Sequence, residues 1–213
     1  MAQLASWAKG AEGTHISSEA LRGIARRFCG GEAAADSSTY EGKALAAKKI
    51  RDRQYVKESL MVCDWMFPLL DIPNSEDHIG DPALESRIVH AVLGKDLDEQ
   101  SLNRIGERVF NLQRAILARE GHTGRSDDKL PDEWHTSPLE THVADPDCLA
   151  PGKNGEPISR VGAVVEKQEF ERMKDEYYEL RGWDVATGRQ TKKKLEEMGL
   201  DDIVEGLDRN PLN

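Results

Sequence analysis

Cys63 is the residue of this sequence whose chemistry most needs an explanation. It lies in the stretch KESLMVCDWMFP, residues 57–68, where one thiol sits inside a run of large apolar side chains. A free cysteine often packs as a small hydrophobic group. A thiolate is also a metal ligand. The local pattern leaves both interpretations open.

Local spacing offers no second ligand beside this thiol. The six histidines lie at positions 15, 78, 90, 122, 135 and 142, and the three cysteines lie at 29, 63 and 148. They form no His-x3-His, His-Glu-x-x-His or Cys-x-x-Cys pair. Asp127 and Asp128 are interpreted as solvated acids rather than a catalytic pair. Tyr177, Tyr178 and Trp183 are expected to belong to the core rather than to a cofactor site.

The composition excludes several classes of function. The chain has 213 residues, with 29 Lys and Arg against 39 Asp and Glu, so its formal net charge is −10. This charge opposes binding to a nucleic acid backbone. No apolar run approaches the roughly 20 residues that cross a bilayer, and no signal peptide pattern is present. The odd number of cysteines, without a close pair, indicates a reducing cytoplasm.

Apolar residues at helical spacing predict an all-α fold. Helices are expected over residues 15–31, 40–63, 82–94, 98–121, 168–181, 191–198 and 201–205, and no strand alternation persists. The fourth of these helices is expected to begin at Asp98. Its core-facing stripe is expected to consist of Leu102, Ile105, Val109, Leu112 and Ile116.

Residues 121–162 form a different kind of sequence, rich in proline and glycine and without either period. We expect a long ordered loop that wraps the helices, with Leu130 and Trp134 packed against them. Residues 1–14 are expected to be a frayed or truncated opening segment, and residues 15–213 an irregular multi-helix domain.

Four collinear stretches carry a family resemblance. They are RRFCGGEAAADSSTYEGKALAAKKIRDR, VKESLMVCDWMFP, IGERVFNLQRAILAREGHTGRSDDKLPDEW and MKDEYYELRGWDVATGRQTKKKLEEMGL. Together they resemble the C-terminal helical domain of the tungsten- or molybdenum-dependent aldehyde:ferredoxin oxidoreductases. The resemblance runs from about residue 15 to residue 204, and it covers only the last third or so of a complete member of the family.

The resemblance implies a site at the end of the second predicted helix. In the family, a tungstopterin or molybdopterin lies beside a 4Fe-4S cluster, and the fourth cluster cysteine ends an Asp-x-x-Gly-Leu-Cys motif that also contacts a pterin. Residues 58–63 occupy this motif here. The resemblance therefore implies that Cys63 is the fourth cluster ligand, and that Glu58, Ser59, Met61 and Val62 lie on the pterin side.

The sequence departs from the family pattern at two motif positions. Glu58 replaces the aspartate, and Met61 replaces the glycine that allows close backbone approach. The N-terminal β-rich pterin domain and the three clustered cysteines are not found in this sequence. No catalytic residue is identified, although His15 is the candidate. No cofactor is expected on the isolated chain.

The resemblance implies part of an enzyme that oxidises aldehydes to carboxylic acids and passes the electrons to ferredoxin. The expected partners are the pterin- and cluster-binding portion of the same enzyme, ferredoxin and the aldehyde, with no nucleic acid and no membrane. The isolated chain is expected to be inactive. The alternative is a helical interaction or structural module that derives from this domain and carries no cofactor.

Overall fold

The computed structural model describes residues 18–62, 75–77, 79–141 and 146–203. This part of the chain is mostly helical and contains one small sheet of two strands, which confirms the all-α class. None of the helices described is long and apolar enough to cross a membrane. The proposed opening segment, residues 1–14, lies outside the described residues.

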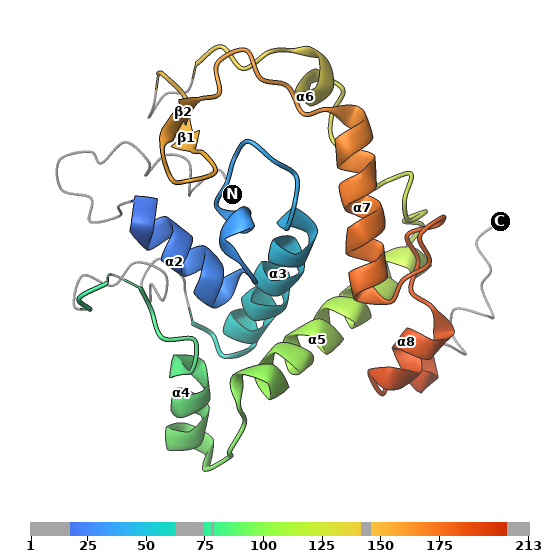
Figure 1. The fold of residues 1–213 in the computed structure, drawn as a ribbon. Helices are drawn as coiled ribbons and strands as arrows, with labels where there is room; N and C mark the ends of the chain where they lie inside the picture. The colour runs from blue at the N-terminus through green and yellow to red at the C-terminus, as the bar shows by residue number, and fades with distance from the viewer. Residues whose placement is uncertain (1–17, 63–74, 78, 142–145, 204–213) are drawn as a thin grey trace.

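The described elements follow one another along the chain as shown in Figure 1. They are α2 (Ser18–Phe28), the 3-10 helix η1 (Glu32–Ala34), α3 (Lys43–Ser59), α4 (Leu84–Leu93), α5 (Glu99–Arg119), α6 (Glu133–Thr136), β1 (Leu149–Pro151), β2 (Pro157–Ser159), α7 (Lys167–Arg181) and α8 (Lys192–Glu197). The two strands pair antiparallel, with Ala150 opposite Ile158.

Helix α3 is the centre of the fold, because it packs against α2, α5 and α7. Its contact with α5 is close at Gly106, where an added Cβ would lie 2.0 Å from the backbone oxygen of Asp52. A glycine is therefore required for the two helix backbones to approach each other at this point. Val56, Val89 and Leu102 form a buried apolar cluster between α3, α4 and α5.

The buried face of α5 differs from the predicted stripe. Leu102 is buried, but Ile105 is 42% exposed and Ile116 is 38% exposed, so the prediction for these two residues was wrong. The face turned inward carries Asn111, which is fully buried and accepts a hydrogen bond from Trp183 Nε1 at 2.9 Å. The inward face of α5 is therefore occupied by a polar side chain with a distant hydrogen-bond partner, and the two isoleucines lie outside it.

Buried charges join α3 to α7. Arg181 is fully buried, and it forms an ion pair with Asp52 of α3. Its guanidinium carbon lies 4.6 Å from the ring centroid of Phe110 and 5.0 Å from that of Tyr177. The guanidinium is thus held by a carboxylate and two aromatic faces, an arrangement that arginine satisfies and lysine does not.

Tyr178 and Trp183 are buried in the same region, as the sequence predicted for the aromatic residues near the end of α7. Their ring centroids lie 6.0 Å apart in a stacked arrangement. Gly182, with a φ of 67°, ends α7 where the sequence indicated a C-terminal glycine signal.

Residues 130–141 and 146–165, which we call the arch, cross the top of Figure 1 above α2 and α3 and lead into α7. The arch is ordered by backbone hydrogen bonds, such as Val165 N–H to the Trp134 oxygen at 2.8 Å and Ser37 N–H to the Pro151 oxygen at 2.8 Å. Trp134 itself is 59% exposed. The expectation that its indole packs against the helices was therefore wrong. His135 packs against α7 instead, because its ring centroid lies 5.8 Å from that of Phe170, and its Nδ1 lies 2.6 Å from the Val165 oxygen within the arch.

Candidate functional site at the C-terminal end of α3

Helix α3 ends in a tight turn just before the motif cysteine. Val62 N–H donates to the Lys57 oxygen at 2.9 Å, and Met61 N–H donates to the Glu58 oxygen at 3.1 Å. These two bonds define a Schellman motif with Met61 at its left-handed position. The helix therefore ends at Ser59, earlier than the predicted end at residue 63.

Met61 occupies a backbone conformation that glycine prefers. Its φ is 57°, and its side chain is 92% exposed. A residue with a Cβ is strained in the left-handed region by roughly 1–2 kcal/mol. The turn that ends α3 therefore favours glycine at this position by itself, apart from any contact with a ligand. This explains the glycine at the corresponding position of the motif that residues 58–63 resemble.

The polar side chains of the turn have few internal partners. Glu58 is exposed, and its Oε1 accepts a hydrogen bond from Gln54 at 3.0 Å. Ser59 is also exposed, and its hydroxyl donates to the Tyr55 oxygen at 2.7 Å. A carboxylate in the last turn of a helix lies near the negative end of the helix dipole. An external group that donates hydrogen bonds to Glu58 would relieve this repulsion.

The turn is held in place by the residues that precede it. Tyr55 is buried, its hydroxyl bonds to Gln113 of α5, and its ring centroid lies 5.4 Å from that of Phe110. Val56 and Leu60 pack on the cluster between α3, α4 and α5. The exposed side of the turn is therefore carried on a rigid support.

Two of the predicted site residues cannot be placed. Cys63, the predicted cluster ligand, and His15, the catalytic candidate, lie outside the described residues. Glu58, Ser59, Met61 and Val62 are brought together by the turn of α3. The part of the chain that the structure describes contains no group of three or more His, Cys, Asp or Glu side chains that could hold a metal ion.

The other two cysteines are buried in the fold. Cys29 packs in an apolar cluster with Ile24 and Phe28 of α2, and burial raises the pKa of its thiol. Cys29 is therefore a packing residue. Cys148 is also buried, next to β1. Neither residue is arranged as an exposed thiolate.

The residues at the α3 turn fit a pterin better than they fit a complete cluster. The exposed Glu58 carboxylate and Ser59 hydroxyl can accept hydrogen bonds from a heterocycle, beside backbone that is open at Met61. A 4Fe-4S cluster takes four thiolates, whereas the whole sequence has three cysteines, two of them buried. The chain can therefore supply at most part of the ligand set of such a cluster.

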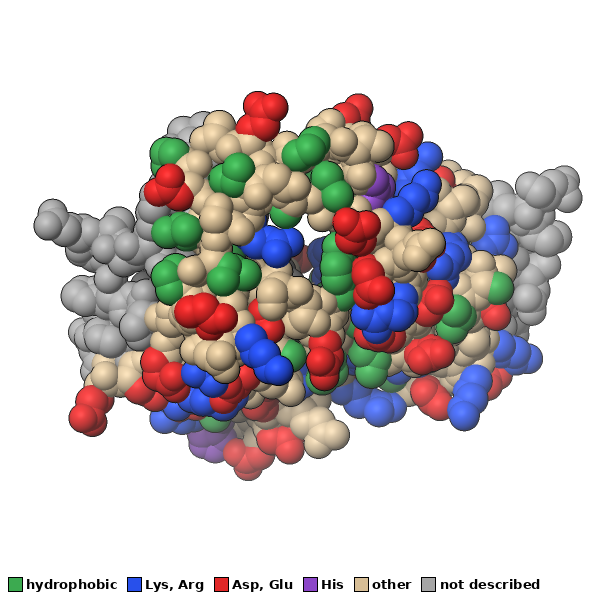
Figure 2. All heavy atoms as spheres, turned by 45° about the horizontal axis from the view of Figure 1, so that its top comes forward, with side chains coloured by type: hydrophobic (Ala, Val, Ile, Leu, Met, Phe, Trp, Pro, Cys, Tyr) green, Lys and Arg blue, Asp and Glu red, His purple; other side chains and the backbone are tan. Residues whose placement is uncertain are grey.

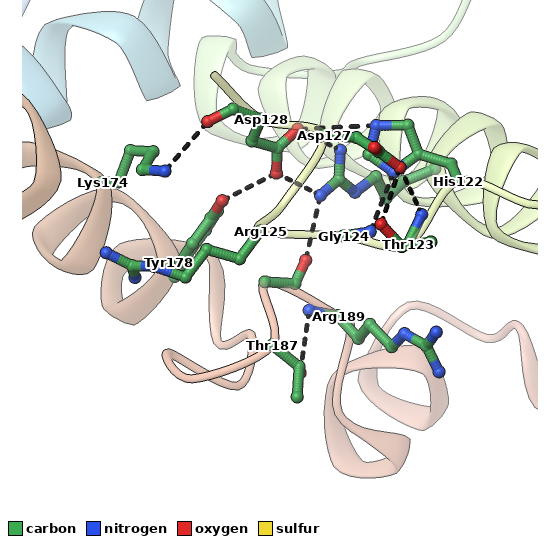
Figure 3. A network of polar contacts seen from close by, with 12 residues as sticks. His122, Thr123, Gly124, Arg125, Asp127, Asp128, Lys174, Tyr178, Thr187 and Arg189 are labelled. Atoms are coloured by element: carbon green, nitrogen blue, oxygen red, sulfur yellow. Dashed lines mark hydrogen bonds and ion pairs between the residues drawn. The ribbon is translucent and has the colours of Figure 1, made fainter. Parts of the chain in front are cut away.

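A second polar network, which the sequence did not predict, surrounds Asp128 (Figure 3). Its carboxylate pairs with Arg114 of α5 through both oxygens and accepts a hydrogen bond from the Tyr178 hydroxyl at 2.7 Å. Its backbone oxygen accepts from Lys174 Nζ at 2.9 Å. The Nε2 of His122 lies 3.7 Å from the carboxylate. The network thus ties α5, the turn at 122–128 and α7 together.

The charges of this network stabilise the packing of α5 against α7. Burial alone would raise the pKa of Asp128, but the hydrogen bonds from Arg114 and Tyr178 outweigh it and hold that pKa below its ordinary value. Burial and the neighbouring carboxylate raise the pKa of Tyr178. The prediction of a solvated acid is correct for Asp127, which is exposed and bonds to Thr123, and wrong for Asp128. The sequence shows only that two acids are adjacent, and this does not indicate that Asp128 pairs with residues of α5 and α7.

Comparisons with known proteins define the class of protein. Residues 3–200 match the family described as aldehyde ferredoxin oxidoreductase, domains 2 & 3. The helical fold is also similar to a solved structure titled the active site complex BamBC of benzoyl coenzyme A reductase in complex with 1,5 dienoyl-CoA. The TM-score is 0.51 at 20% identity, over 83% of this chain and 22% of that chain. This likeness concerns the fold alone.

The chain belongs to the aldehyde ferredoxin oxidoreductase family, because the match covers most of its length. It is 31% identical over 117 residues to the tungsten-containing aldehyde ferredoxin oxidoreductase of Pyrococcus abyssi, which is 55% of this chain and 16% of the relative. The tungsten-containing enzyme of Pyrococcus furiosus is 32% identical over 113 residues, 53% of this chain and 15% of the relative. The match therefore spans a small part of each relative's length.

Proposed function

We propose that this chain is the C-terminal helical part of an oxidoreductase that depends on a tungstopterin or molybdopterin and a 4Fe-4S cluster. The enzyme oxidises an aldehyde to a carboxylic acid with water as the source of the added oxygen, and the two electrons pass to ferredoxin while two protons are released. In this proposal residues 15–213 form the domain, and the enzyme acts in the cytoplasm. The family match and the tungsten-containing relatives support this function.

The proposed role of the chain is to complete a site whose other side is supplied by the pterin- and cluster-binding portion of the same enzyme. Glu58 and Ser59 would bind the pterin, next to Met61 and Val62, and Cys63 would provide the fourth thiolate of the cluster. The bound cofactors would supply the redox chemistry and the path for electrons. The α3 turn would contribute hydrogen bonds and orientation.

The observation that carries the proposal is the turn that ends α3. It places exposed polar groups directly before Cys63 in the sequence, on a helix end supported by Tyr55 and Val56. A cluster ligand that follows a rigid helix end is held in a defined position, which redox centres require because their potential depends on the surroundings of the sulfurs.

The test uses the native assembly, purified by an affinity tag on this chain. Tungsten, molybdenum and iron are measured by elemental analysis, and aldehyde-dependent reduction of ferredoxin is assayed. We expect tungsten or molybdenum with iron, and activity that Cys63→Ser abolishes together with cluster iron. The control Cys29→Ala should keep both, because Cys29 is a packing residue. An assembly without either metal, or an active Cys63→Ser variant with full iron content, would refute the proposal.

The alternative, a cofactor-free structural module, makes the opposite prediction for the native assembly. Both hypotheses predict the same result for the isolated chain, because its three cysteines cannot complete a 4Fe-4S cluster. Reconstitution of the isolated chain with iron and sulfide should therefore leave it without a stoichiometric cluster and without activity. A stable cluster on the isolated chain would contradict the ligand count.

A further inference from the structure

A large apolar hollow lies beneath the arch. Its volume is about 970 Å³, and it is bounded by α2, α3, the arch and the start of α7. Figure 2 shows its opening from the side of the arch, with hydrophobic side chains around it and charged side chains at its edge. The hollow lies on the side of α2 and α3 that faces the arch, and no residue of the α3 turn lines it.

The walls of the hollow leave large apolar side chains uncovered. Trp134 is 59% exposed, Ile50 of α3 is 43% exposed and Leu139 of the arch is 38% exposed. An engineered apolar cavity of about 150 Å³ can stay dry and empty, but this hollow is several times larger. Contiguous apolar surface of this kind marks a place where another molecule binds.

The charges around the hollow argue against an anionic ligand. Lys43 lines it, but its ammonium donates to the backbone oxygens of Ala33, Ala34 and Asp36 at 2.7, 2.9 and 2.5 Å. All three of its N–H groups are therefore used within the fold. Arg160, Glu133 and Glu140 also line the hollow, so side chains of both charges surround it and no excess of positive charge faces it. The occupant that fits is apolar and uncharged.

We infer that the hollow is the docking surface for an apolar segment of the pterin- and cluster-binding portion of the same enzyme. This inference rests on the proposed function. The matched region is only 16% of the Pyrococcus abyssi relative, so most of the polypeptide of such an enzyme is available to cover the hollow. The arch, which lies over this hollow and leads into α7 (Figure 1), then acts as a strap that holds the docked segment against α2 and α3.

The first experiment identifies the occupant by photo-crosslinking in the native assembly. Leu139→p-benzoylphenylalanine places the probe in the wall of the hollow. Leu180→p-benzoylphenylalanine is the matched control, because Leu180 is 42% exposed and does not line the hollow. We expect the probe at Leu139 to capture a peptide of the cofactor-binding portion and the probe at Leu180 to capture none. Equal capture at both positions, a second copy of this chain, a lipid or other small apolar molecule, or no capture at Leu139 would each overturn the inference.

A second measurement does not depend on variants. Hydroxyl-radical oxidation of Trp134 should be rapid in the isolated 213-residue chain and several-fold slower in the native assembly, whereas oxidation of Leu180 should change little. Unchanged oxidation of Trp134 would overturn the inference. Metal content and aldehyde oxidation are measured on the same unirradiated assembly. Metal content and activity therefore test the proposed function, and crosslinking and Trp134 oxidation test docking at the hollow, so the two can fail independently.

Discussion

Replacing Met61 by glycine tests whether the α3 turn is strained. The left-handed φ of 57° costs a side chain with a Cβ roughly 1–2 kcal/mol. Glycine removes this strain, but it adds conformational entropy to the unfolded chain, which costs roughly 0.4–1 kcal/mol. No burial is lost, because Met61 is 92% exposed. We therefore expect Met61→Gly to increase the free energy of unfolding by about 0.5–1 kcal/mol.

The assay is urea denaturation of the isolated chain, followed by circular dichroism at the helix band. Met61→Ala is the control for side-chain size, because it keeps the Cβ and should change the free energy of unfolding by less than about 0.5 kcal/mol. Leu60→Gly is the contrasting variant, because Leu60 has a φ of −88°, so glycine relieves no strain there and removes the packing of the Leu60 side chain on the cluster. It should lose stability. A Met61→Gly variant that is no more stable than Met61→Ala would refute the reasoning.

Three further predictions concern packing, charge and the proposed site. Gly106→Ala should lower the free energy of unfolding by about 1–3 kcal/mol or more, measured by denaturation, because the new Cβ would meet the Asp52 backbone oxygen at 2.0 Å. Asp128→Asn should cost about 2–3 kcal/mol at neutral pH, because Arg114 loses its partner. The pKa of Asp128 in the folded chain lies below the ordinary value of about 3.9. The stability that the Asp128 carboxylate contributes is therefore complete above about pH 3.9 and is lost as the pH falls through the folded pKa. The difference in unfolding free energy between wild type and variant should shrink over this range in acid denaturation. Glu58→Gln should leave the unfolding free energy of the isolated chain unchanged within about 0.5 kcal/mol and reduce the pterin content of the native assembly, measured by fluorescence of the released pterin; a full pterin content would contradict the proposed contact.

Local signals in the sequence predicted the helical class and several helix ends. Helix α5 begins at Glu99, next to the predicted start at Asp98, and the Asp98 side chain caps it by accepting from Ser101 N–H at 2.7 Å. Gly182 ends α7 in the left-handed conformation. The end of α3 was placed too late, because Met61 carries no glycine signal for the left-handed position that it adopts. Such ends depend on neighbours within one turn, so a sequence reports them only where the residue type reveals the backbone conformation.

Some features of the candidate site were indicated by the sequence, and others were shown only by the structure. The resemblance of residues 58–63 to a family motif came from the sequence, whereas the turn that groups Glu58 with Met61 required the structure. The role of Asp128 was missed, because its partner Tyr178 lies 50 residues away and the charge pattern around Asp128 is that of a solvated loop. Nothing in the exposed loop sequence around Trp134 distinguishes a packed indole from one that lines an open hollow.

The sequence alone determined the helical class, the net acidic charge and the number of thiols, because each follows from residue types and their spacing, and four stretches of it carried the resemblance to the family. Only the tertiary structure decided which face of α5 is buried, since Asn111 finds its partner Trp183 72 residues along the chain. The same holds for the pairing of Asp52 with Arg181, which lie 129 residues apart. A buried polar group is stable only where a distant partner satisfies it, and which residues meet across the core is a property of the packing and not of the local sequence.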